Sequence, residues 1–115
     1  MMTTSPRPAD QRRSQRVTIP DHPQILDAHN GTVIGQLVNL SSGGLMIASA
    51  NCIQRNTVCQ MRIPLRQGDN QLEIRIGAES LWCEDANDSG VHWTGFQIID
   101  ISREDQKILD SFVDN

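Results

Sequence analysis

The sequence predicts a mostly β protein: a small antiparallel six-stranded β-barrel with a C-terminal α-helix and a flexible N-terminal arm. Two segments, 59–65 and 72–78, alternate apolar and polar residues as half-buried strands do. Turn signals made of Gly, Asn and Asp separate such segments along the chain. The last apolar residues recur at helical spacing. Several short strands followed by one helix favour a barrel whose end the helix covers.

Composition limits the chain to one domain. It has 115 residues, of which 37% are hydrophobic and 3% aromatic, so Val, Ile and Leu must fill a single modest core. No apolar run is long enough to insert into a membrane. Residues 1–10 lack the apolar core of a signal peptide and predict a cytoplasmic tail. We expect a disordered tail over 1–11 and a single domain over 12–115.

The first half of the chain contains an entering segment and a hairpin. After a basic cluster, residues 17–19 form a short extended piece that Pro20 ends. A strand at 24–28 and a partner at 32–40 flank Asn30-Gly31, which predicts a type I′ hairpin turn.

The second half holds the remaining strands and the helix. Strands are expected at 45–49, 59–65, 72–82 and 91–101, with a turn at 67–70 and a polar loop at 84–90. In the loop 50–56, Asn56 is the candidate for a left-handed backbone angle. Ser102 resembles a helix N-cap, with acidic Glu104 and Asp105 in the first turn. The apolar face of this helix would be Ile108, Leu109, Phe112 and Val113.

The turn 39–44 lies between two apolar runs and is the candidate recognition site. Asn39 and Ser41 supply an amide and a hydroxyl two residues apart, and so are expected to share a strand face. Gly43 and Gly44 leave room for a close approach to the main chain. The alternative is a plain hairpin corner, because Asn, Ser and Gly are the residues that turns prefer.

Charge is distributed unevenly. The net charge is −4, yet the first sixteen residues are basic, with Arg7, Arg12, Arg13 and Arg16 against Asp10. A basic arm on an acidic body argues against binding of a nucleic acid polymer, which needs an extended positive face. It is better suited to a small anionic ligand.

Catalytic and metal-binding signatures are scarce. The sequence has no Gly-x-Ser-x-Gly elbow, no phosphate-binding Gly-Lys-Ser/Thr loop and no His-Glu-x-x-His. The histidines share no ligand spacing, and the three cysteines have no paired metal spacing. We therefore expect no catalytic or metal residues, and reduced thiols in preference to a zinc site or a disulfide. The three histidines are His22, His29 and His92, and the three cysteines are Cys52, Cys59 and Cys83.

Two motifs in order give the sequence a family resemblance. Arg12-x-x-x-Arg16 precedes Asn39-x-Ser41-x-x-Gly44. The pair resembles the PilZ domain family, in which Arg-x-x-x-Arg and Asp/Asn-x-Ser-x-x-Gly bind the bacterial messenger cyclic di-GMP. The resemblance runs from Gln11 to Val113. Its further features are the doubled Arg12-Arg13, the strand start Gly44-Leu45, Trp82 near a strand end, Gly95-Phe96 in the last strand and the closing helix.

The resemblance implies a ligand site with two parts. Arg12, Arg13 and Arg16 would wrap the nucleotide from the arm, while Asn39, Ser41, Gly43 and Gly44 form its floor and Trp82 is a candidate for base stacking. Guanidinium groups grip phosphate oxygens in bidentate fashion, pair with the guanine O6 and N7 edge, and stack on purine faces. Asn39 replaces the commoner Asp and lacks its charge, which predicts a lower affinity.

The implied function is a cyclic di-GMP receptor whose arm folds over the ligand and so switches contact with an unidentified protein partner. The main alternative is a PilZ-fold adaptor that binds proteins and not the nucleotide. A single-strand nucleic-acid binder would need exposed aromatics along a basic groove. An enzyme would need a nucleophile, base or metal set that these residues do not supply.

Overall fold

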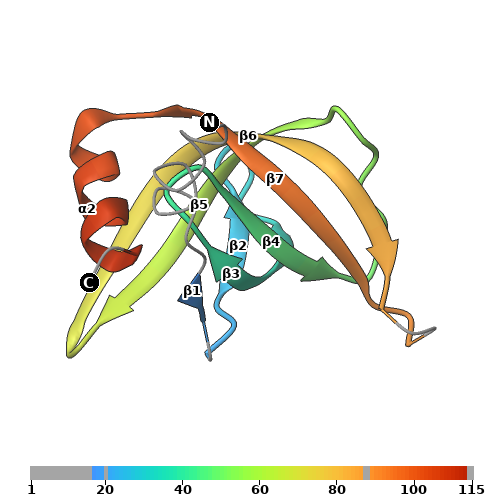
Figure 1. Cartoon of the computed structure of the whole chain (residues 1–115), viewed down its shortest axis with the longest axis horizontal. Coiled ribbons are helices and arrows are strands. Elements are labelled where there is room, and N and C mark those ends of the chain that lie inside the picture. Colours follow the sequence, from blue (N-terminus) through green and yellow to red (C-terminus); the bar gives the residue numbers. More distant parts are fainter. Residues whose placement is uncertain (1–16, 20, 87–88, 114–115) are drawn as a thin grey trace, which may run out of the picture.

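The structure is a computed structural model that describes residues 17–19, 21–86 and 89–113 (Figure 1). The predicted tail over 1–11 and the three arginines of the arm, Arg12, Arg13 and Arg16, lie outside the described residues.

The described chain forms a closed antiparallel barrel of six strands, as predicted. The strands pair in the order β3-β2-β5-β6-β7-β4, and a further β3–β4 pairing closes the ring. A short β1 pairs with the end of β3, and one C-terminal helix lies beside β6 (Figure 1). The elements are β1 Val17–Thr18, β2 Gln24–Asp27, β3 Val33–Leu40, β4 Gly44–Ser49, β5 Val58–Gln67, β6 Asn70–Asp85, β7 His92–Ile101 and α2 Arg103–Val113.

Alternating strand residues fill the barrel. Ile63 of β5 faces Ile74 of β6 across the ladder, and both are fully buried. Burying such a side chain stabilises the fold by about 1.5–3 kcal/mol. Further fully buried aliphatic residues come from five of the strands and the helix: Ile25, Leu37, Leu40, Leu45, Ile47, Met61, Ala78 and Leu109. Aliphatic residues thus build the core, as the composition predicts.

The helix begins as predicted. The Ser102 hydroxyl accepts the N–H of Asp105 at 3.1 Å, which is the N-cap bond. Asp105 in turn accepts the backbone N–H of Arg75 on β6 at 3.0 Å. Leu109 and Val113 are buried in the barrel core. No helix among the described residues is long and apolar enough to span a membrane.

The first hairpin departs from the type I′ prediction. Gly31 has φ of 76°, but Asn30 is not in the left-handed region that a type I′ turn requires there. The Asp27 carboxylate instead accepts the N–H groups of His29 at 2.8 Å and Asn30 at 3.3 Å. These local hydrogen bonds stabilise a loop longer than a two-residue turn. The N–H of Asp27 donates to the carbonyl of Thr32 at 2.8 Å and closes this loop.

β6 extends three residues beyond its predicted end, and its ladder contains a bulge. The register with β7 shifts between Ser80, opposite Phe96, and Trp82, opposite Gly95. The extra residue, Leu81, is exposed. In a regular strand, Ser80 and Trp82 would lie on the same face of the sheet. Because of the bulge they lie on opposite faces, so Ser80 points into the barrel and Trp82 points outward.

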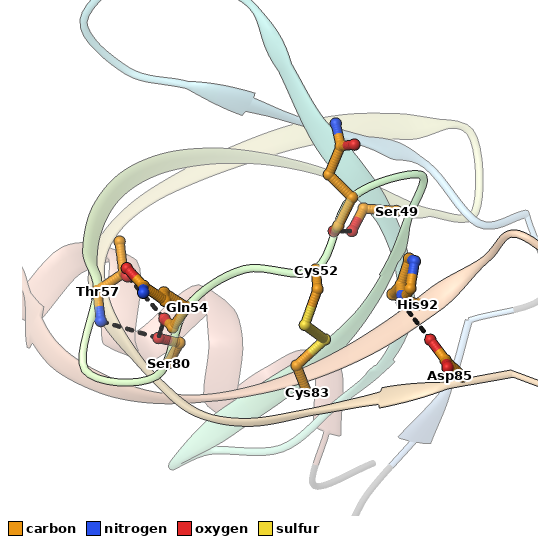
Figure 2. Close-up of a disulfide and its surroundings, with 9 residues drawn as sticks. Ser49, Cys52, Gln54, Thr57, Ser80, Cys83, Asp85 and His92 are labelled. Atoms are coloured by element: carbon orange, nitrogen blue, oxygen red, sulfur yellow. Dashed lines mark hydrogen bonds and ion pairs between the residues drawn. A yellow bond between two sulfur atoms is a disulfide. The ribbon is translucent and has the colours of Figure 1, made fainter.

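The bulge is held by the loop 50–57. The Ser80 hydroxyl donates to the carbonyl of Gln54 at 2.5 Å and accepts the N–H of Thr57 at 2.9 Å (Figure 2). The N–H of Asn56 donates to the carbonyl of Ser80 at 2.9 Å. Asn56 has φ of 66°, which confirms the predicted left-handed angle.

The same loop carries a disulfide that the sequence analysis did not predict. Cys52 is bonded to Cys83, with the Cα atoms 6.1 Å apart (Figure 2). The expectation of three reduced cysteines is therefore wrong for this pair, while Cys59 is free. The two cysteines are 31 residues apart, and only the extension of β6 brings Cys83 beneath the loop.

Replacing Asn56 tests the left-handed angle. Asn56→Ala is expected to lower the free energy of unfolding by about 1 kcal/mol, because a β-carbon disfavours this backbone region more than the Asn side chain does. Asn56→Gly, the matched control, is expected to change it little, because Gly adopts the angle without a steric penalty. Urea unfolding followed by circular dichroism measures both. Equal effects of the two variants would contradict the assignment.

Candidate functional site

The turn 39–44 is held by the side chain of Ser41. The backbone N–H of Ser41 donates to the carbonyl of Gly44 at 2.8 Å. The Ser41 hydroxyl donates to the same carbonyl and accepts the N–H of Gly44, each at 3.1 Å. Ser41 is only 3% exposed. The prediction that Asn39 and Ser41 share a strand face is wrong, because β3 ends at Leu40 and the Ser41 side chain is buried in the turn.

The two glycines of the turn have different roles. A β-carbon on Gly44 would lie 2.4 Å from the carbonyl oxygen of Phe96, so the pairing of β4 with β7 requires glycine there. Gly43 is exposed, and a β-carbon on it would meet nothing within 4 Å. The carbonyl of Gly43 accepts the N–H of Ile98 at 2.9 Å, which joins the turn to β7.

A row of paired residues joins the turn to Trp82 on the outer face of the barrel. Asn39 of β3 pairs with Met46 of β4, Met46 with Gly95 of β7, and Gly95 with Trp82 of β6. Their neighbours along the strands, such as Leu45 and Phe96, are buried, so the row faces outward. At about 4.8 Å per strand, the row is about 14 Å wide.

Trp82 lies against Gly95. A β-carbon on Gly95 would stand 2.3 Å from Cε2 of the indole, so the ring occupies the space that a side chain would take. Trp82 is nevertheless 38% exposed. Gly95 is the site residue whose role sequence reasoning missed. A glycine inside a strand is the signal for such a close approach.

β1 brings the N-terminal end of the described chain to the same place. Thr18 pairs with Asn39 and Val17 with Leu40, and the N–H of Ile19 donates to the carbonyl of Val38 at 3.0 Å. The structure therefore brings together the entering chain, Asn39 and the glycine turn, with Trp82 at the far end of the row. It does not place the arginines, which lie outside the described residues.

The free cysteine is poorly suited to nucleophilic chemistry. Burial, and secondarily the negative charge of Asp27, raise the pKa of the Cys59 thiol above its ordinary value. The thiol is thus held in its protonated, unreactive form near neutral pH.

A group of donor atoms elsewhere was also missed. Cys52, Cys83 and His92 place their sulfur and nitrogen atoms within 4.8 Å of one another. They come from a loop and two strands, so no sequence spacing connects them.

Comparison with known proteins agrees with this architecture. The family model of the PilZ domain matches residues 10–115. The structure of the Bacillus subtilis inhibitor of motility (MotI/DgrA) is similar, with a TM-score of 0.76 and 16% identity, over 90% of this chain and 49% of that one. The PilZ domain of Escherichia coli YcgR with c-di-GMP has a TM-score of 0.66 and 16% identity, over 90% of this chain and 88% of that one.

The family resemblance of the sequence is thus confirmed, and the structural neighbours share the fold. This chain spans about half the length of the MotI/DgrA structure. Among curated proteins, no match to this sequence was found.

Substitutions of the two glycines test the turn. Gly44→Ala is expected to lower the free energy of unfolding by about 3 kcal/mol, at the upper end of the cost of overpacking, because the carbonyl of Phe96 must move. Gly43→Ala, one residue away and in open space, is expected to stay within about 0.5 kcal/mol of the parent. Chemical denaturation compares the two. A Gly43→Ala variant as unstable as Gly44→Ala would show that the turn itself, and not strand contact, requires glycine.

Proposed function

Because the chain belongs to the PilZ domain family, we propose that it is a cytoplasmic receptor domain for cyclic di-GMP and not an enzyme. The observation that carries the proposal is the pairing of β1 with the end of β3, with Thr18 opposite Asn39. This pairing attaches the basic arm to the barrel at the edge of the candidate site. A relative of the same fold, the PilZ domain of YcgR, has been solved with c-di-GMP.

In this proposal the arginines supply most of the ligand contacts. Arg16 directly precedes Val17, and Arg12 and Arg13 lie within five residues of it. An extended chain spans about 3.3–3.6 Å per residue, so all three guanidinium groups can reach a ligand on the turn. Their planar forks pair with phosphate oxygens and with the guanine O6 and N7 edge.

The turn supplies the floor of the proposed site. Asn39 offers an amide that accepts from the N1 and N2 edge of guanine. Gly43, exposed and without a side chain, lets the ligand approach the main chain. The Ser41 hydroxyl has one O–H, and the carbonyl of Gly44 takes it. We therefore give Ser41 the role of shaping the turn that forms this floor.

Trp82 supplies a stacking surface at the far end of the row. Its ring rests on the bare backbone of Gly95, which fixes its position on the barrel wall. A base lying on this ring would be about 14 Å from the β3 strand, within the span of a molecule with two guanines on opposite sides of a phosphate ring.

Ligand binding would then order the arm over the barrel. The arm is self-repelling because its net charge is positive, and the two ligand phosphates neutralise it. Ordering the arm consumes part of the contact energy and creates a new surface. We propose that this surface is what a protein partner recognises.

Removing an arm arginine tests the site. Arg16→Ala is expected to weaken cyclic di-GMP binding by about 1–3 kcal/mol, which is roughly 5- to 150-fold. Arg103→Ala, an exposed arginine of α2, is the matched control and is expected to keep the parent affinity. Calorimetric titration with cyclic di-GMP, and with GTP and cyclic GMP for specificity, measures the effect. Binding that is equal in both variants would remove the arm from the mechanism, and no binding by the parent would favour the adaptor alternative.

Removing the stacking surface is a separate test. Trp82→Ala is expected to weaken binding by about 1–3 kcal/mol, the usual value of one base on an aromatic ring. The control is Trp93 of β7, which lies two residues before Gly95 and is exposed to a similar degree. Trp93→Ala is expected to have little effect on binding. Gly95→Ala keeps the indole but displaces it, and so is expected to resemble Trp82→Ala. Parent affinity in both Trp82→Ala and Gly95→Ala would exclude stacking here.

A further inference from the structure

The loop 50–57 and the ends of β6 and β7 gather metal-binding atoms away from the turn. Cys52 lies in the loop, Cys83 late in β6, and His92 is the first residue of β7 (Figure 2). One donor atom from each lies within 4.8 Å of the other two. In a tetrahedral zinc site with bonds of about 2.0–2.3 Å, ligand atoms stand about 3.4–3.8 Å apart. The three side chains are thus already gathered within the reach of one ion.

The strand register explains why they meet. Cys83 pairs with Thr94, and Asp85 pairs with His92, so these four residues share one side of the β6–β7 ladder. Thr94 is fully buried, which makes this the inward side. The bulge at Leu81 puts Cys83 on this side. Cys52 closes the group from the loop above.

Two buried polar atoms here lack a hydrogen bond among the described residues. They are Oγ1 of Thr94, whose side chain is fully buried, and Nδ1 of His92. Nδ1 of His92 lies 2.7 Å from Oδ1 of Asp85, close enough for an ion pair but not aligned for a hydrogen bond. A buried polar atom without a partner costs about 1–3 kcal/mol. Because Nδ1 of His92 faces Asp85, Oγ1 of Thr94 is the atom in this group of described residues that has neither a hydrogen bond nor an ion pair. It lies opposite Cys83 on the ladder, which indicates a site with room for a further polar group.

We propose that Cys52, Cys83 and His92 bind a zinc-class divalent ion when the disulfide is reduced. Two thiolates and an imidazole are soft to borderline ligands, which favour Zn²⁺ and disfavour Mg²⁺ and Ca²⁺. Asp85 is the positioning residue, because a carboxylate beside a metal-bound imidazole orients the ring and raises its basicity. Cys52 is exposed, so the ion has an entry path and a water can complete the tetrahedron.

The disulfide and the metal exclude each other. Reduction by a dithiol breaks the bond between the sulfurs of Cys52 and Cys83, transfers two electrons to them, and leaves the dithiol as its own disulfide. Binding of the ion then releases two protons, one from each thiol. Reducing compartments keep such pairs as thiols, and metal binding is the more frequent use of neighbouring cysteines there. In either state the loop stays cross-linked to β6.

Zinc binding by the full, untagged chain tests the proposal. The protein is reduced without oxygen, freed of reductant, and titrated with Zn²⁺ against a chromophoric chelator, and with Co²⁺ to record thiolate-to-metal absorption. The reduced parent is expected to bind one equivalent of Zn²⁺ or of Co²⁺, and its cobalt complex is expected to show the thiolate-to-metal band. The oxidised parent is expected to bind neither ion. Cys83→Ser is expected to lose the band and the tight site. Cys59→Ser, the matched control at the free cysteine, is expected to keep both.

Asp85→Asn distinguishes a built metal site from metal binding by the two thiols alone. It leaves both cysteines and the ring in place, yet is expected to weaken zinc binding about 10- to 100-fold. His92→Gln is expected to weaken it further and to change the cobalt spectrum. Circular dichroism checks that each variant is folded. Binding by the reduced parent no tighter than by Cys83→Ser, or unchanged by both Asp85→Asn and His92→Gln, would overturn the proposal.

Discussion

One extra residue in β6 determines which side chains both sites present. Leu81 shifts the β6–β7 register, so Trp82 faces outward and Cys83 faces inward. Without it, strict alternation would send the indole into a core already filled by Phe96 and turn the cysteine away from the loop. The hydroxyl of Ser80 holds the bulge by joining it to Gln54 and Thr57. A single buried serine therefore supports two surfaces that face in opposite directions.

The motif at the turn is first a folding motif. Gly44 is glycine because β4 runs against the carbonyl of Phe96, and Ser41 is serine because its hydroxyl bridges both backbone groups of Gly44. Among the residues of the turn, Asn39 and Ser42 are half-buried and Gly43 is exposed, so these three keep surface for a ligand. A short motif that reads as a ligand signature thus divides into residues that close the barrel and residues that face outward.

The predictable part of the molecule is the part that local patterns determine. Alternation gives the strands around Ile63 and Ile74, and a serine before two acidic residues gives the helix start at Ser102. The unpredicted part depends on register between distant strands. The bulge, the length of β6 and the Cys52–Cys83 pair follow from which residue faces which across a ladder, and no local spacing encodes that. At Asn30, the carboxylate of Asp27 overrode a strong turn signal.

The ends of the described chain flank one hollow. Val17 and Ile19 of the entering chain and Phe112 near the end of α2 line it together, beside Pro64 and Leu65 of β5. Neighbouring ends allow a barrel to be circularly permuted, with a short linker joining them and new ends opened in an exposed hairpin. Such a permuted protein would keep every strand pairing. The order of the strands along the chain and their pairing in the barrel are therefore separable properties of this fold.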